Sequence, residues 1–263
     1  MNAASKKAIL IVSFGTSYEN TRKRTIDAIE RDIADAFPAC PAYRAWTSKM
    51  IIAKLKKRDG IIIHTVKEAM EQMLLDGITD VIVQPTHVIN GIENDQMKAD
   101  ALSFRDRFSS IVFGNPLLTT EEDNQAVVQA VAGEFQDMDQ ETALVLMGHG
   151  TEHYANSVYA ALDYRFKDMG HKNIFLGTVE AYPALDSLLR AADSFQPKKI
   201  VLAPFMIVAG DHARNDLAGA EADSWDSILK ADGFETEVIM KGLGEIDAIA
   251  EIFVKHLKKA ESL

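Results

Sequence analysis

Short, continuously apolar runs alternate with longer amphipathic stretches along the whole chain. Six runs rich in β-branched residues are predicted as strands: AILIVSF, DVIVQPT, ALVLMGH, NIFLGTV, KIVLAPF and TEVIM. A run that is apolar at every position is typical of a parallel-sheet strand buried on both faces. The stretches with helical periodicity lie near residues 20–36, 48–58, 65–77, 94–107, 121–135, 154–169, 184–194, 215–231 and 245–260. This alternation predicts a doubly wound α/β fold.

The pattern of the first half recurs in the second half. ILIVSFGTS resembles LVLMGHGTE, and DVIVQPTHVINGIEND resembles KIVLAPFMIVAGDHARND in the same order. Between these matches, RAWTSKM occupies the place that GTVEAYP has in the second copy. We therefore predict two lobes related by internal duplication, an N-terminal lobe of residues 1–125 and a C-terminal lobe of residues 126–263.

Three polar residues follow successive predicted strands of the second half. His149 ends ALVLMGH, Glu180 follows NIFLGTV, and His212 lies in AGDHARND after the next strand. The carboxyl ends of parallel strands meet at one edge of an open sheet, so we expect these side chains to converge. Two imidazoles and a carboxylate suit a first-row divalent ion with coordination positions left open. The sequence therefore predicts a metal site in the C-terminal lobe.

The first half carries other residues at the equivalent strand ends. The alignment places Phe14, Thr47 and Glu93 opposite His149, Glu180 and His212, respectively. His87 and Glu93 lie in THVINGIEND, and the strand-end argument predicts that both face the crevice. Glu93 is expected to act as an outer metal contact or a proton acceptor. His87 fits equally well a functional group and a structural histidine at a strand end.

The charge of the chain is uneven. A formal net charge of −11 argues against non-specific binding to nucleic acid or to an anionic membrane. Against that background, RAWTSKMIIAKLKKR holds six cations and no acid between residues 44 and 58. A solvated helix face accounts for some of these cations. Arg44 and Lys49 lie near the strand end aligned with Glu180, and with Arg214 they are predicted to bind a polyanionic substrate.

Several classes of protein are excluded by what the sequence lacks. No apolar run approaches the roughly 20 residues of a transmembrane helix. The first run, AILIV, is followed by polar SFGTS without a small-residue cleavage site, so we expect a cytoplasmic protein. The single cysteine, Cys40, cannot form an intramolecular disulfide framework or a Cys-based zinc site. No Walker loop, GxGxxG, GxSxG or HExxH pattern stands at a strand–turn–helix position.

Six segments resemble the anaerobic sirohydrochlorin cobaltochelatases, which are ATP-independent class II chelatases related in fold to ferrochelatase. In order they are VSFGTS, TSKMIIAKLKKRDG, HVINGIEND, MGHG, VEAYP and VAGDHARNDLAG, and they cover nearly the whole chain. The resemblance implies an α/β fold of two flavodoxin-like, doubly wound lobes with parallel sheets and a tetrapyrrole cleft between them. It implies His149, Glu180 and His212 as metal ligands and Glu93 as a further active-site acid.

The resemblance also implies an activity, the insertion of Co²⁺ into sirohydrochlorin or precorrin-2 in cobalamin biosynthesis. The expected enzyme is a lyase that takes Co²⁺ as its substrate metal, uses no organic cofactor and binds neither nucleic acid nor membrane; a homo-oligomer is left open. Metal insertion removes two pyrrole protons, and His149 or His212, assisted by Glu93, is predicted to accept them. Sirohydrochlorin carries many carboxylates. The predicted contacts to it are Arg44, Lys49, His87 and Arg214.

Three alternatives remain open at this point. Sites of nitrogen and oxygen ligands discriminate weakly between neighbouring divalent ions, so a ferrochelatase that inserts Fe²⁺ for sirohaem fits the same ligands. A metal or tetrapyrrole carrier without turnover is the second alternative, although a carrier needs a closed site. The third is a flavodoxin-like regulatory module, for which His149 and His212 would not be required.

Overall fold

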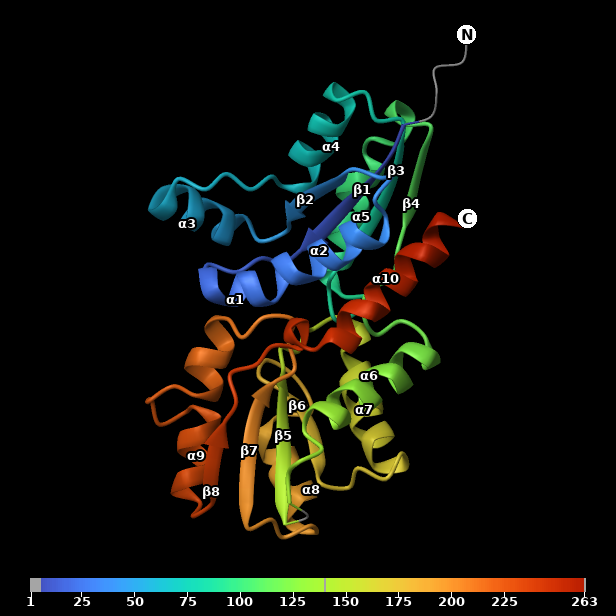
Figure 1. The fold of residues 1–263 in the computed structure, drawn as a ribbon. Helices are drawn as coiled ribbons and strands as arrows, with labels where there is room; N and C mark the ends of the chain where they lie inside the picture. Colours follow the sequence, from blue (N-terminus) through green and yellow to red (C-terminus); the bar gives the residue numbers. More distant parts are fainter. Residues whose placement is uncertain (1–5, 140, 263) are drawn as a thin grey trace. The chain divides into compact units, whose positions relative to one another are not determined.

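Two compact α/β units make up the described part of the chain, residues 6–139 and 141–262 of a computed structural model (Figure 1). The first unit extends to Thr119 and takes in the chain again from Asp247 onward, and the second unit is Thr120–Ile246. Each contains one four-stranded sheet in which every strand pair is parallel. The predicted parallel α/β fold is confirmed. None of the described helices combines the length and apolar character that crossing a bilayer requires.

The first unit is built on a sheet with strand order β2-β1-β3-β4. Its strands are β1 (Lys7–Ser13), β2 (Ala42–Trp46), β3 (Asp80–Pro85) and β4 (Ser110–Phe113). Its helices are α1 (Glu19–Arg24), α2 (Ile26–Ala36), α3 (Lys49–Asp59), α4 (Val66–Leu75), α5 (Ile92–Leu102) and α10 (Asp247–Glu261), with a 3₁₀ turn at Arg105–Arg107. Successive strand residues point to opposite faces, so Leu10 packs with α4 and α5 in one core cluster. Helix α10 contacts α2, β3 and β4.

The second unit repeats this plan with strand order β6-β5-β7-β8. Its strands are β5 (Thr142–Gly148), β6 (Ile174–Thr178), β7 (Lys199–Pro204) and β8 (Glu235–Val238). Its helices are α6 (Glu121–Glu134), α7 (Ser157–Asp168), α8 (Leu185–Asp193), a π-helix (Ala213–Leu217) and α9 (Trp225–Ala231), with 3₁₀ turns at Tyr154–Asn156 and Leu243–Glu245. All seven residues of β5 are buried, as a central strand covered on both faces should be.

The two sheets share more than their strand order. Beyond the paired strands, Val179 N–H donates to Gly148 O at 3.0 Å and Glu180 N–H donates to His149 O at 2.9 Å. The first unit has the same two bonds, from Thr47 to Ser13 at 3.0 Å and from Ser48 to Phe14 at 3.2 Å. The backbone register thus matches Phe14 to His149 as predicted. It matches Glu180 to Ser48, one residue beyond the predicted Thr47.

Some observed elements differ from the predicted ones: β2 is absent from the six predicted strand runs, and the helix predicted at 20–36 is divided into α1 and α2. The helix expected at 215–231 is a π-helix and a separate helix, α9, which begins after Ser224. Ser224 caps α9 by accepting the Ser227 N–H at 3.1 Å, and this cap sets the later start. Strand β4 was not predicted, because its SIVF segment has too few apolar residues to stand out from the preceding helix.

The C-terminal helix also differs from the expected division into lobes. The predicted C-terminal lobe ran to residue 263, whereas α10 packs within the first unit and buries Ile249, Ile252 and Phe253. An amphipathic helix needs an apolar surface to cover, and the sequence pattern does not say which of two similar sheets supplies it.

Candidate metal centre

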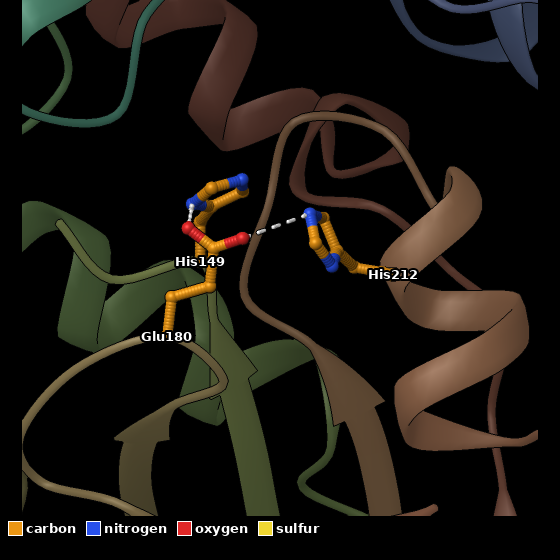
Figure 2. A group of neighbouring side chains, drawn as sticks. All are labelled: His149, Glu180 and His212. Atoms are coloured by element: carbon orange, nitrogen blue, oxygen red, sulfur yellow. Dashed lines mark ion pairs between the residues drawn. The ribbon is translucent and has the colours of Figure 1, made fainter.

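His149, Glu180 and His212 lie together at the carboxyl edge of the second sheet (Figure 2). His149 directly follows β5, Glu180 comes two residues after β6, and His212 precedes the π-helix that follows β7. Each side chain offers one ligand atom, and these atoms lie within 4.8 Å of one another. The structure therefore brings together the three side chains that the sequence predicted to converge.

The Glu180 carboxylate lies between the two imidazoles. Its Oε2 is 3.5 Å from His149 Nδ1, and its Oε1 is 3.7 Å from His212 Nε2 (Figure 2). The two rings meet edge to face, with centroids 4.5 Å apart. Distances of 3.5 Å and more are too long for good hydrogen bonds, so the three groups do not satisfy one another. A divalent ion bound among them would gain all three donors.

The candidate site is open to solvent. The side chains of His149, Glu180 and His212 are 45%, 50% and 34% exposed. Three protein donors leave coordination positions for water or for an incoming ligand, as in catalytic rather than structural metal sites. The arrangement suits an ion that is bound and then released.

Glycines on both sides of His149 allow its backbone to lie where it does. A Cβ on Gly148 would stand 2.6 Å from the Tyr159 ring. Gly150 has φ of +86°, and a Cβ there would stand 2.9 Å from Ala181 N. The GHG sequence thus meets two steric requirements of a histidine on this crowded turn.

Asn156 joins the loops that carry His149 and Glu180. Its Oδ1 accepts the Thr151 N–H at 3.0 Å, and its Nδ2 donates to Tyr182 O at 2.6 Å. One side chain therefore fixes the turn after β5 against the turn after β6. Asn156 was not predicted, because no sequence pattern marks an asparagine whose two partners lie in separate loops.

Hydrogen bonds to the Nδ1 atoms leave both Nε2 atoms available as donors to a metal. His149 Nδ1 lies 2.8 Å from Gly150 O, and His212 Nδ1 lies 2.9 Å from Asp216 Oδ2. A carbonyl or carboxylate oxygen only accepts, so each Nδ1 carries the hydrogen. Asp216 was also not predicted from the sequence, although its position four residues after His212 is a detectable signal.

The remaining predicted residues lie outside this cluster. Glu93 is an exposed residue in the first turn of α5, and Lys49 is the exposed first residue of α3. Lys49 lines a pocket between α3 and α4 together with Lys56 and His64. Arg214 is exposed on the π-helix, two residues after His212. The roles of Glu93, Lys49 and Arg214 stay predictions.

Arg44 lies within β2 and is already paired with carboxylates. Its Nε donates to Glu30 at 2.8 Å, its Nη2 contacts Asp27 Oδ1 at 2.5 Å, and the same Nη2 also contacts Glu30. Burial raises the pKa of the Glu30 carboxyl in spite of the guanidinium beside it. A substrate carboxylate would have to compete with both acids, so the predicted role of Arg44 as a clamp requires these ion pairs to open.

His87 is buried, with 8% of its surface exposed, and neither ring nitrogen has a hydrogen-bond partner among the described residues. Desolvation lowers the pKa of His87 to about 4, so the ring is neutral at physiological pH. The imidazole can contact a substrate only if its surroundings open, and its substrate-binding role stays a prediction.

His87 should make the first unit sensitive to acid. The unfolded chain binds this proton near pH 6.5 and the folded chain only near pH 4, so stability falls as the pH drops between these values. We expect His87 to lower the free energy of unfolding by about 2 kcal/mol at pH 5 relative to pH 7. Urea denaturation of the wild type and His87→Leu at both pH values measures this, and an equal acid loss in the two proteins would contradict it.

In sequence, this chain is similar to cobalt chelatases over nearly its whole length. The family model for cobalt chelatase (CbiK) matches residues 7–262. The sirohydrochlorin cobaltochelatase of Salmonella typhimurium is 39% identical over 255 residues, which is 97% of this chain and 96% of that protein. Sirohydrochlorin cobaltochelatase CbiKC of Nitratidesulfovibrio vulgaris is 30% identical over 265 residues, 98% of this chain and 92% of that protein.

Solved structures agree at the level of the fold. The sirohydrochlorin chelatase SirB of Bacillus subtilis subspecies spizizenii, in complex with cobalt, has a TM-score of 0.65 at 16% identity, with 98% of this chain and 96% of that chain covered. CbiX, described as the terminal enzyme of sirohaem biosynthesis in denitrifying bacteria, has a TM-score of 0.55 at 16% identity, with 96% and 99% covered. With the family model matched over nearly the whole length, this chain belongs to the CbiK cobalt chelatase family.

Proposed function

We propose that this protein is a sirohydrochlorin cobaltochelatase, which inserts Co²⁺ into sirohydrochlorin for anaerobic cobalamin biosynthesis without ATP. The observation that carries the proposal is the open cluster of His149, Glu180 and His212 in a chain of the cobalt chelatase family. The relatives from Salmonella typhimurium and Nitratidesulfovibrio vulgaris, at 39% and 30% identity, are named for this activity.

The cluster suits the first half of the reaction, in which hydrated Co²⁺ is captured. The Nε2 atoms of His149 and His212 and one oxygen of Glu180 provide a mixed nitrogen and oxygen donor set for a divalent ion. With three protein donors the ion keeps exchangeable positions, and these can pass from water to the pyrrole nitrogens of the substrate. Solvent exposure of the three side chains keeps the ion accessible.

The second half of the reaction releases protons. When Co²⁺ enters the macrocycle, it replaces two pyrrole N–H protons. A base or water must accept both of them. A neutral imidazole that has released its metal presents a free Nε2 lone pair for this purpose. We propose that His149 or His212 accepts these protons and that Glu93 assists.

The substrate is a polyanion, and the proposed contacts to its carboxylates are cationic. Lys49 and Arg214 are exposed and remain the better candidates. Arg44 and His87 are weaker candidates because Arg44 is paired with Asp27 and Glu30, and His87 is buried. A ferrochelatase that makes sirohaem is a second candidate function, since the same donor set accepts Fe²⁺.

An absorption assay tests the proposal. Purified protein is mixed under anaerobic conditions with sirohydrochlorin and either Co²⁺ or Fe²⁺, and the spectrum of the metallated product is followed over many equivalents of substrate. We expect turnover with Co²⁺ well above the rate without protein. Faster turnover with Fe²⁺ would favour the ferrochelatase, and a change that stops at one equivalent would identify a carrier. A rate equal to the protein-free control would overturn the proposal.

A further inference from the structure

Asp216 is a direct side-chain partner of the candidate ligand His212, and neither the sequence nor the family comparison suggested a role for it. Its Oδ2 lies 2.9 Å from His212 Nδ1. The Asp216 side chain is 43% exposed and that of His212 is 34% exposed, so neither is driven into this contact by burial alone. The contact orients the imidazole that faces Glu180.

The backbone between these two residues has an unusual form. Residues Ala213–Leu217 form a π-helix, in which Ala218 N–H donates to Ala213 O at 3.2 Å. Single π turns are rare in proteins, and those that occur often lie at functional sites. Ala213 and Leu217 are buried, so the turn is anchored in the core while His212 and Asp216 project from it.

A glycine closes the turn. A Cβ on Gly219 would stand 2.1 Å from Asn215 O, so no other residue fits this backbone without a shift. The chain thus accepts a sterically demanding turn directly after a candidate metal ligand. Its effect is to place a carboxylate beside His212 Nδ1.

The hydrogen bond decides which nitrogen of His212 is free. An ionised carboxylate can only accept, so Nδ1 keeps its hydrogen and the Nε2 lone pair is exposed. His212 Nε2 is also the atom nearer to Glu180, at 3.7 Å from Oε1. Partners of this kind fix the tautomer and the ring orientation of metal-bound histidines. Without the hydrogen bond to Asp216, the His212 ring could rotate and exchange between its two neutral tautomers.

His149 reaches the same tautomer by a different route. Its Nδ1 lies 2.8 Å from the carbonyl oxygen of Gly150, a main-chain group that substitution does not remove. His212 depends on a side chain instead. This difference makes the role of Asp216 open to direct test.

We propose that Asp216 is a positioning residue, which holds His212 as the Nδ1–H tautomer with Nε2 directed toward the metal site. The part that concerns the metal rests on the proposed function, whereas the tautomer can be measured without any metal. The competing interpretation is a surface pair four residues apart in a helical turn, which would affect stability slightly and the metal not at all.

The test combines ¹⁵N NMR of the histidine side chains in the metal-free protein with titration by Co²⁺ alone. In Asp216→Asn, the amide can turn its NH₂ toward Nδ1 and stabilise the opposite tautomer, while the size of the side chain is preserved. We expect His212 to lose its uniform Nδ1–H signature in Asp216→Asn and Asp216→Ala. We also expect a 10- to 100-fold weaker apparent affinity for Co²⁺, about the effect typical of such partners.

Two further variants complete the design. Asp216→Glu keeps a carboxylate and should recover most of the affinity, and Asp223→Asn removes an exposed acid from the same unit and should change neither signal. The proposal is overturned if both Asp216→Asn and Asp216→Ala keep the wild-type tautomer and bind Co²⁺ within twofold of wild type. If the wild type binds no Co²⁺ at all, the proposed metal function fails, and the NMR signature alone then decides whether Asp216 positions His212.

Discussion

His149→Ala and His212→Ala should each lower the rate of Co²⁺ insertion at least about 100-fold. Each substitution removes one of two nitrogen donors from a site that has only three protein ligands among the described residues. Loss of an indirect partner of a ligand typically costs 10- to 100-fold, so loss of the ligand itself belongs at or above the upper end of that range. The absorption assay is run at saturating sirohydrochlorin with varied Co²⁺. It then gives the maximal rate and the apparent affinity for Co²⁺ separately.

His171→Ala is the matched control for these two variants. His171 belongs to the same unit but precedes β6, so it lies at the opposite edge of the sheet from the candidate site. It should keep the wild-type rate. Since both candidate histidines are about one-third to one-half exposed, their loss should leave the folded structure intact, which circular dichroism checks. Wild-type rates in both His149→Ala and His212→Ala would remove the site assignment.

Arg44→Met should destabilise the first unit by about 2–3 kcal/mol. The substitution keeps the apolar stem of the side chain but leaves Asp27 and Glu30 without their shared cation. Breaking a fully buried ion pair from one side costs about 3–5 kcal/mol, and partial exposure of these groups reduces that figure. The side chain of Glu30 is only 14% exposed, so water cannot fully replace the guanidinium.

The measurement can be confined to one unit. The chain has two tryptophans, and they fall one in each unit, Trp46 at the end of β2 and Trp225 in α9. In a Trp225→Phe background, urea denaturation followed by fluorescence therefore reports on the surroundings of Trp46. Lys49→Met, which removes an exposed cation from the same basic stretch, should change the unfolding free energy by less than about 0.5 kcal/mol.

A second variant separates the loss of Arg44 from the exposure of its partners. Combining Arg44→Met with Asp27→Asn and Glu30→Gln removes the unpaired charges and should recover much of the lost stability. If Arg44→Met alone is as stable as wild type, the ion pairs contribute nothing measurable. Arg44 would then be free to serve as the substrate contact that the sequence predicted.

Much of the second unit could be predicted because its signals are local. An apolar strand that ends in a polar residue places that residue at the carboxyl edge of the sheet, and His149 and Glu180 follow directly from this rule. His212 does not end a strand directly, and its prediction required the assumption that the loop after β7 stays at the same edge of the sheet. The same rule gave His87 and Glu93 their places at the edge of the first sheet.

Other features depend on contacts between segments far apart in the sequence. Arg44 belongs to a cationic stretch, yet its partners Asp27 and Glu30 lie in α2, 17 and 14 residues earlier in the sequence. The alignment of the halves was off by one at Glu180 because only the strand register identifies Ser48 as its counterpart. The C-terminal helix gave no sign of which sheet it covers.

Because the two sheets share one register, equivalent backbone positions in the two units carry side chains with different roles. Ser48 accepts a hydrogen bond from Ile51 N and caps α3, whereas Glu180, on the equivalent ladder bond, faces two imidazoles. Phe14 and His149 divide in the same way. One unit therefore carries a side chain that serves the fold at this position, while the other unit presents a candidate metal donor there. Metal chemistry of this kind can be acquired or lost without redesign of the scaffold.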